Sequence, residues 1–324
     1  MTSFWQKIPR PFFVMAPMAD VTDAAFRQLV AKHGAPDVFW TEFVSADGLY
    51  HTREIAKMKD EENPLMRDLL FQKNEHPIVA QIFSSKPEMI AYATKLVAEL
   101  GFDGVDLNMG CPDRSIERQG CGSAMIKSPE VARSVIRAAK GASTLPVSVK
   151  TRVGYNKESL DEWLPVILEE KPAALTVHLR TRKEMSNVPA NWELMKKAVE
   201  IRNRLNPEVL LIGNGDVTST EEGERLVVES GCDGVMIGRG MFGNPWVFAG
   251  RTMEDTPLAE KLAALTELAH DFEKITPAKN FAILKKHIKA FVTGFAGAAE
   301  LRAKLMEAES ASELEKVVDA FLKA

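Results

Sequence analysis

The chain has 324 residues, of which 45% are hydrophobic and 27% charged, and its formal net charge is -4. This length suits one barrel-sized domain with a smaller appendix, and the composition is that of an ordinary globular protein with no apolar run as long as a membrane span. The slightly acidic balance excludes a global attraction to nucleic acid, so an RNA partner would need a local basic surface.

The cysteine pattern indicates a reducing compartment. Cys111, Cys121 and Cys232 are odd in number and show no paired spacing, which argues against both a disulfide framework and a zinc site. The first residues, MTSFWQKIPRPFF, lack the charged-then-apolar pattern of a secretion signal. We therefore expect a cytoplasmic protein without a metal centre.

Short β-rich runs alternate with helix-length amphipathic stretches along most of the chain. The predicted strands span residues 12–16, 38–43, 77–83, 103–108, 146–151, 174–179, 209–214 and 234–238. Helices are predicted between them, among others at 87–100, 129–139, 191–204 and 220–230. The repeated strand-helix order is typical of a parallel sheet. Eight units in about 250 residues favour an α/β fold of the closed (β/α)8 TIM-barrel type over an open doubly wound sheet.

The pattern changes after Gly250. Residues 251–257 read as a linker, and only helical periodicity remains from Pro257 onward. We therefore predict a catalytic barrel at residues 1–250 and a small helical domain at residues 251–324.

Chemistry in a TIM barrel lies at the carboxyl ends of the strands, and the residues that end these strands are polar and specific. They are Ala16, Pro17, Met18, Glu42, Gln81, Asn108, Cys111, Lys150, Arg152, His178, Asn214, Gly215, Asp216, Gly238 and Arg239. Any one of them could be structural, but together they predict an active site.

The last two strand-end loops, GNGDVTS and IGRGMFGNP, are rich in glycine. Tight turns would explain the glycines, but Arg239 adds a planar cation suited to phosphate oxygens, which favours a phosphate site. With Gln81, Lys150 and His178 directed at a ring, such a site fits flavin mononucleotide (FMN), because Lys150 can stabilise anionic reduced flavin. The residues assigned to FMN are Ala16, Pro17, Met18, Gln81, Lys150, His178, Asn214, Gly215, Asp216, Gly238 and Arg239.

Six stretches carry a resemblance to a known family. They are APMADVTDAAFR, DLNMGCPDRSIERQGCGSAM, VKTRVGY, VHLRTRKEM, IGNGDV and GVMIGRGMFGNPWVF. Together they resemble the tRNA-dihydrouridine synthase family over the whole barrel, with the helical tail where that family carries its RNA-binding domain. The resemblance implies an FMN enzyme that uses NADPH to reduce the C5=C6 bond of particular uridines in tRNA. Two positions depart from it: Asp20 replaces a usual glycine and adds a carboxylate near the flavin mouth, and Leu179 adds bulk beside a substrate residue.

In this chemistry Cys111 becomes the candidate proton donor. Hydride transfer from flavin N5 to uracil C6 leaves negative charge that a proton at C5 must quench, and a thiol with a pKa of about 8.5 can donate it. A packed, inert cysteine is the alternative for Cys111, and we interpret Cys121 and Cys232 in that way. We assign Asn108, Arg152 and Arg180 to substrate binding.

The tail contains a basic segment, PAKNFAILKKHIKAFVTGF, with no acidic residue between Lys274 and Glu300. If this segment forms one helix, its apolar face contains Phe281, Leu284, Ile288 and Phe291. Another face of the same helix contains Lys279, Lys286 and Lys289. The lysines are either a solvated surface or contacts to the tRNA backbone, and the resemblance favours tRNA.

Two other enzymatic interpretations stay open. A flavin barrel that acts on a free pyrimidine, as dihydroorotate dehydrogenases do, explains the barrel residues but gives the basic tail no purpose. A flavin-free barrel in which Lys150 forms a Schiff base, as in aldolases, is the other.

Overall fold

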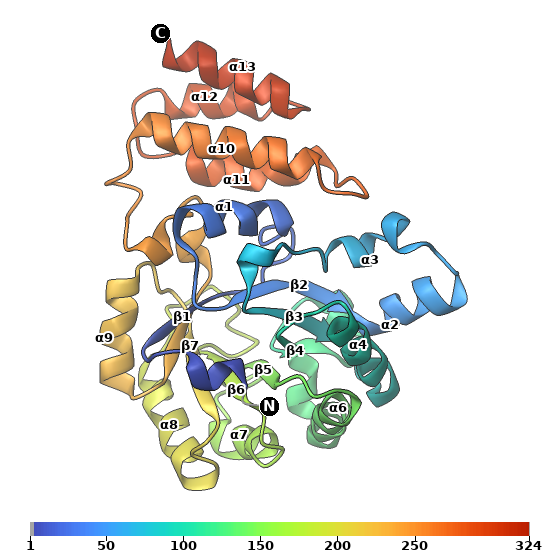
Figure 1. Ribbon diagram of the computed structural model, residues 1–324. Coiled ribbons are helices and arrows are strands. Elements are labelled where there is room, and N and C mark those ends of the chain that lie inside the picture. The colour runs from blue at the N-terminus through green and yellow to red at the C-terminus, as the bar shows by residue number, and fades with distance from the viewer. Residues whose placement is uncertain (1–2, 324) are drawn as a thin grey trace.

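The computed structural model describes residues 3–323 and has the predicted (β/α)8 architecture (Figure 1). Its strands are β1 (Phe12–Met15), β2 (Phe39–Ser45), β3 (Ile78–Phe83), β4 (Gly104–Met109), β5 (Val147–Arg152), β6 (Ala174–His178), β7 (Leu210–Asn214) and β8 (Gly234–Ile237). Each strand lies at its predicted place, within two residues at either end. The sequence periodicity therefore located the whole sheet.

All eight strands run parallel in the order β1-β8-β7-β6-β5-β4-β3-β2. The ends of this order meet, because Val14 of β1 forms a parallel bridge with Val38, and the Met15 N–H donates to the Val38 carbonyl at 3.1 Å. The carboxyl ends of the strands therefore surround one opening.

Helices surround the barrel. They are α1 (Ala24–Gly34), α2 (Ala46–Tyr50), α3 (Pro64–Arg67), α4 (Pro87–Glu99), α5 (Arg114–Glu117), α6 (Pro129–Ala142), α7 (Leu160–Leu168), α8 (Glu193–Leu205) and α9 (Thr220–Ser230). Local chemistry sets several of their ends. The Ser219 hydroxyl accepts the Glu222 N–H at 3.1 Å and caps α9, and Gly231 ends that helix with a φ of 75°.

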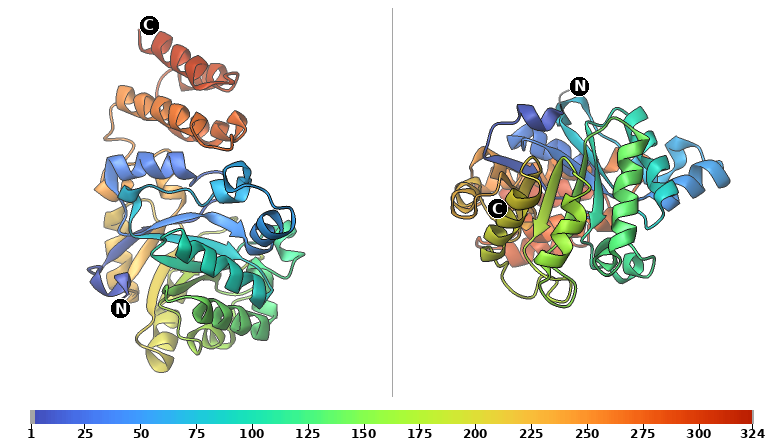
Figure 2. Two further views of the ribbon diagram at one scale, coloured as in Figure 1. Left: turned by 45° about the vertical axis from the view of Figure 1, so that its right-hand side comes forward. Right: turned by 90° about the horizontal axis from the view of Figure 1, so that it is seen from below.

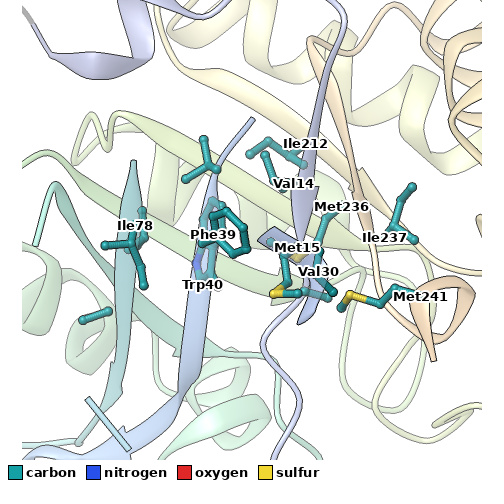
Figure 3. Close-up of a cluster of buried hydrophobic side chains, with 14 of the residues drawn as sticks. Val14, Met15, Val30, Phe39, Trp40, Ile78, Ile212, Met236, Ile237 and Met241 are labelled. Atoms are coloured by element: carbon teal, nitrogen blue, oxygen red, sulfur yellow. The ribbon is translucent and has the colours of Figure 1, made fainter. Parts of the chain in front are cut away.

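Apolar side chains pack inside the barrel and between its strands and helices. Figure 3 shows Val14 and Met15 of β1 near Trp40 of β2 and Met236 of β8, and each of them is completely buried. Burying a side chain of this size contributes about 1.5–3 kcal/mol. The polar groups that a ligand can reach lie toward the carboxyl ends of the strands, whereas those deeper in the barrel, such as Asp106 and Ser148, are buried.

The tail consists of α10 (Leu258–Glu273), α11 (Lys285–Phe291), α12 (Ala298–Leu305) and α13 (Ala311–Leu322). Figures 1 and 2 show α10 and α11 beside α1 of the barrel, with α12 and α13 farther away. The four predicted apolar side chains of this segment are buried, Leu284, Ile288 and Phe291 completely and Phe281 partly, although Phe281 and Leu284 lie on a 3-10 helix that precedes α11. Among residues 3–323, no helix has both the length and the apolar character that a membrane span requires.

Candidate active site

A cavity of about 240 Å³ opens at the carboxyl ends of the strands and brings together the predicted barrel residues except Glu42, whose carboxylate pairs with Lys279 instead. Its walls include Ala16, Pro17, Met18, Gln81, Asn108, Cys111, Lys150, Arg152, His178, Arg180, Asn214, Gly215, Asp216, Gly238 and Arg239. These residues come from seven of the eight strands or the loops that follow them. The predicted convergence of strand ends on one site is therefore present in the fold.

Cys111 lies on the loop between β4 and α5, half-buried in the cavity wall. The side-chain oxygen of Asn108 accepts the Cys111 N–H at 2.9 Å, and the Cys111 carbonyl accepts the Ser123 N–H at 2.9 Å. Gly122 has a φ of 60°, and a Cβ atom there would lie 2.6 Å from the Cys111 carbonyl oxygen, so this approach requires glycine. The loop is thus held from two sides.

Burial raises the pKa of the Cys111 thiol, and the nearby cations of Arg152 and Lys150 only partly oppose the shift. The thiol is therefore protonated at neutral pH, as a proton donor must be. Cys121 and Cys232 are both buried, and neither is part of the cavity wall. Cys111 is the cysteine that can meet a ligand there.

Lys150 and His178 face the cavity from neighbouring strands. The Lys150 ammonium donates to the Asn214 side-chain oxygen at 3.1 Å. Burial and, secondarily, Arg152 lower the pKa of Lys150 to about 8, so it is mostly charged at neutral pH. Burial and the charge of Lys150 lower the pKa of His178 far below its usual range, so its imidazole is neutral. Arg180 lies 3.1 Å from His178 Nε2 and can only donate, which leaves the proton on Nδ1.

Arg152 and Arg180 are buried and already engaged with the protein. Arg152 donates to the Gly110 carbonyl at 2.8 Å and to the Met185 carbonyl at 3.0 Å. Arg180 donates to the Val188 carbonyl at 2.6 Å. These contacts hold the loops after β4 and β6 against each other. Both side chains also line the cavity, so the substrate contacts assigned to them remain predictions.

Asp216, in the loop after β7, forms ion pairs with Arg239 in the loop after β8 and with Arg180 in the loop after β6, so it links three strand-end loops. Its backbone has a φ of 60°, in the left-handed region. The Arg239 side chain is 61% exposed, whereas that of Arg180 is 3% exposed. Arg239 can therefore turn to another anion without leaving a buried position.

The described residues of the cavity wall carry more positive than negative charge. Lys150, Arg152, Arg180 and Arg239 are cations, and Asp216 is the carboxylate among them. His178 adds no charge, because its pKa is lowered. This arrangement suits a ligand with an anionic group and can stabilise negative charge that develops on a bound ring.

The tail lysines lie outside this cavity, and the prediction of one shared lysine face is wrong. Asn280 caps a 3-10 helix, η8 (Phe281–Leu284), so Lys279 precedes the helical segment. The Lys279 side chain is 3% exposed, and its Nζ lies 2.6 Å from the Glu42 carboxylate. It was assigned to tRNA as a surface charge, but the structure places it in a buried ion pair between tail and barrel. Lys286 and Lys289 are exposed on α11.

The two departures from the family pattern lie away from the cavity wall. Asp20 has a φ of 55°, a backbone conformation that the family's usual glycine adopts without steric cost. Its carboxylate lies 3.1 Å from Lys286 Nζ. Leu179 is 1% exposed and belongs to the hydrophobic core. The expectation that Leu179 adds bulk beside a substrate residue is therefore wrong, because its side chain packs in the hydrophobic core and not in the cavity wall.

Sequence reasoning missed several residues of the site. The cavity wall also contains Phe43, Gly110, Pro112, Ser186 and Val217. Phe43 follows Glu42 near the end of β2, so its strand-end position was a usable signal. Ser186 lies in a long loop, where no periodicity marks it. No group of three or more His, Cys, Asp or Glu side chains able to hold a metal occurs in the part of the chain that the structure describes.

Comparison with known proteins identifies the family. The model of the family described as dihydrouridine synthase matches residues 14–324. The chain belongs to the dihydrouridine synthase family. It is 41% identical over 322 residues to a protein named "Probable tRNA-dihydrouridine synthase" from Staphylococcus aureus (strain Mu50 / ATCC 700699), covering 98% of this chain and 95% of that one. It is 42% identical over 323 residues to "Probable tRNA-dihydrouridine synthase 2" from Bacillus subtilis (strain 168), with 98% and 96% covered.

Dihydrouridine synthases are flavin oxidoreductases, and this member is accordingly an enzyme. The similarity to solved structures supports the fold and no more than the fold. Histamine dehydrogenase from Rhizobium sp. 4-9 superposes with a TM-score of 0.54 at 14% identity, over 85% of this chain and 50% of that one. A 2-naphthoyl-CoA reductase gives a TM-score of 0.53 at 9% identity, over 76% and 51%.

Proposed function

We propose that this dihydrouridine synthase reduces the C5=C6 bond of particular uridines in tRNA, with FMN as the bound cofactor and NADPH as the reductant. One observation carries the proposal: a protonated thiol, Cys111, shares a cavity with the cations and glycine-rich loops that suit a phosphate-bearing flavin. The names of the relatives from Staphylococcus aureus and Bacillus subtilis support tRNA as the substrate.

The cavity wall supplies groups that fit FMN. Arg239 and the loops at Gly215 and Gly238 would hold its phosphate, because Arg239 is an exposed cation that can leave Asp216 for a second anion. Lys150, which is mostly charged at neutral pH, would face the electron-accepting ring. When bound and reduced, the flavin supplies the hydride for uracil C6.

The residues of this chain then complete the reduction. Hydride addition at C6 leaves negative charge at C5 of the uracil, and the Cys111 thiol would neutralise it by donating its proton to C5. The cations of Arg152 and Lys150 would stabilise the resulting thiolate. Asn108, Arg152 and Arg180 would position the uracil. The neutral His178 would donate a hydrogen bond from Nδ1 to a carbonyl group without transferring its proton.

We assign the helical residues 251–324 to tRNA binding, with Lys286 and Lys289 on the phosphate backbone. A uridine inside folded tRNA must turn out of its stack to reach the cavity, so a second contact away from the barrel would help to hold the RNA. A protein with this substrate would act in the cytoplasm.

Mapping of dihydrouridine in tRNA by mass spectrometry, in cells with and without the gene, tests the function. We expect one or more uridines to lose the modification, and the purified yellow protein to restore it on unmodified tRNA with NADPH. Turnover of free uracil or orotate without activity on tRNA would instead support the free-pyrimidine reductase. A colourless protein that borohydride traps on a carbonyl substrate would support the Schiff-base enzyme.

A further inference from the structure

A buried carboxylate lies beneath the cavity and has no part in the proposed reaction. Asp106 points into the barrel from β4 and is completely buried. It pairs in register with Gln81 of β3 and Ser148 of β5. The Gln81 Nε2 donates to Asp106 Oδ2 at 2.7 Å, and the Ser148 hydroxyl donates to Asp106 Oδ1 at 2.6 Å. Both carboxylate oxygens are therefore engaged.

From Asp106 the hydrogen bonds continue to the cysteine loop. The Asn108 Nδ2 donates to Gln81 Oε1 at 2.9 Å. The Asn108 Oδ1 then accepts two backbone N–H groups, that of Cys111 at 2.9 Å and that of Gly110 at 3.2 Å. An unbroken chain of side chains thus joins the buried carboxylate to the residue proposed as proton donor.

The direction of this chain follows from the chemistry of its first member. An ionised carboxylate only accepts hydrogen bonds, so Gln81 must turn its NH₂ group toward Asp106 and its oxygen toward Asn108. Asn108 must then turn its NH₂ group toward Gln81, which leaves its oxygen for the loop. In the reversed arrangement the Asn108 NH₂ group would face the N–H groups of Gly110 and Cys111, donor against donor.

We propose that Asp106 is a positioning residue, which sets the direction of the Gln81 and Asn108 amides and thereby holds the Cys111 loop. The effect on uridine reduction rests on the proposed function. The hydrogen-bonded relay itself does not, because it consists of contacts within the protein.

The surroundings of Asp106 keep it ionised near neutrality. Burial raises its pKa to about 6, and hydrogen bonds from Ser148 and Gln81 and the charge of Lys150 oppose a larger shift. The indole N–H of Trp40, on β2, also lowers this pKa, although it meets no acceptor at hydrogen-bond distance among the described residues. At neutral pH Asp106 is therefore ionised and can only accept, which fixes the direction of the Gln81 amide.

Amide hydrogen exchange of Gly110 and Cys111 tests the relay in the full-length protein as purified, without tRNA. Asp106→Leu removes the acceptor, and the exchange of both N–H groups should accelerate about fivefold or more, as expected when a hydrogen bond worth about 1 kcal/mol is lost. Asp106→Asn should stay within about twofold of wild type, because its oxygen can still accept from Gln81 while its NH₂ group faces Ser148.

Thr176→Val is the matched control, because it also alters a buried polar side chain of the barrel, one whose hydroxyl has no partner among the described residues. Its loop exchange should equal that of wild type. Wild-type exchange in Asp106→Leu would overturn the proposal, and so would Asp106→Asn behaving like Asp106→Leu, since charge rather than direction would then matter.

Gln81→Leu gives a second test if Asp106→Leu does not fold, because it removes the middle member of the relay. Protection of the Gly110 and Cys111 N–H groups should fall in this variant as well, whereas wild-type protection would contradict the relay. Because no tRNA is used, a failure here is distinct from a failure to form dihydrouridine.

Discussion

At the scale of single residues, Cys111 and Arg239 belong to different half-reactions, and substitutions should separate them. Cys111 lines the cavity and carries a protonated thiol, whereas Arg239 is an exposed cation on the loop after β8. The first is proposed to act on uracil and the second on the cofactor phosphate. Each role therefore has its own measurement.

Cys111→Ala should slow uridine reduction in tRNA by a factor of about 10² to 10⁴, the usual cost of removing a positioned general acid. Flavin reduction by NADPH and flavin content should change little, because the thiol holds neither. Stopped-flow absorbance measures the first half-reaction, and dihydrouridine formation measures the second. Cys232→Ala, which changes a buried cysteine outside the cavity wall, serves as the control. Normal dihydrouridine formation by Cys111→Ala would make the thiol structural.

Arg239→Ala should weaken FMN binding roughly ten- to hundredfold, because a hydrogen bond to a charged group is worth about 1.5–3 kcal/mol. Flavin fluorescence during dilution of the purified protein measures the retained cofactor. Arg225→Ala removes a similarly exposed arginine of α9 and should leave flavin content unchanged. If both variants keep their flavin equally well, the phosphate lies elsewhere.

At the scale of elements, the tail is attached to the barrel by a buried charge cluster. Besides Glu42, Lys279 Nζ lies 3.5 Å from the Asp68 carboxylate and 3.8 Å from that of Asp23. Burial alone would lower the pKa of Lys279, but Glu42, Asp23 and Asp68 raise it, so the ammonium stays charged. One cation thus holds three carboxylates, from β2, from the N-cap of α1 and from the segment after α3.

Lys279→Met should reduce the free energy of unfolding by about 3–5 kcal/mol near pH 8, because it leaves buried carboxylates without their cation. Burial already raises the pKa values of Glu42 and Asp23, so both take up protons more readily as the pH falls. The deficit relative to wild type should therefore shrink toward pH about 5.

Urea unfolding at the two pH values measures this difference. Lys274→Met, at a lysine whose side chain is 73% exposed, should cost little, since exposed ion pairs contribute about 0–1 kcal/mol. An equal effect of the two substitutions would show that the cluster does not stabilise the attachment of the tail.

At the scale of the whole molecule, the exposed lysines of α11, Lys286 and Lys289, lie beside the barrel. Figure 1 shows α11 next to α1, the first helix of the barrel, and Lys286 lies 3.1 Å from Asp20 of the loop between β1 and α1. A polynucleotide held by α11 would therefore already be close to the strand-end loops.

Lys286→Glu with Lys289→Glu should weaken tRNA binding and reduce the slope of log affinity against log salt by about 2, one for each lost phosphate contact. NADPH oxidation by the flavin should be unaffected, because neither lysine lines the cavity. Filter binding over a salt series measures the slope. Lys316→Glu with Lys323→Glu makes the same charge change on and just beyond α13 and is the control. Unchanged affinity would return α11 to a solvated surface.

The sequence by itself determined the parallel barrel and most of the cavity wall. Strand period and strand-helix order depend on neighbouring residues, and the carboxyl ends of parallel strands must meet at one edge. Residues such as Gln81, Lys150 and His178 could therefore be assigned to one site from their strand-end positions, and the cavity contains them.

Only the tertiary structure decided which polar groups meet across the fold. Lys279 read as a surface charge, because the 237 residues that separate it from Glu42 hide their contact from any local pattern. Leu179 and Asp106 lie within predicted strands, but whether a side chain packs in the core or joins a hydrogen-bonded relay depends on residues of other strands. Burial and pairing are set by three-dimensional neighbours, and these in turn decide the charge of Lys279, the neutrality of His178 and the protonation of Cys111.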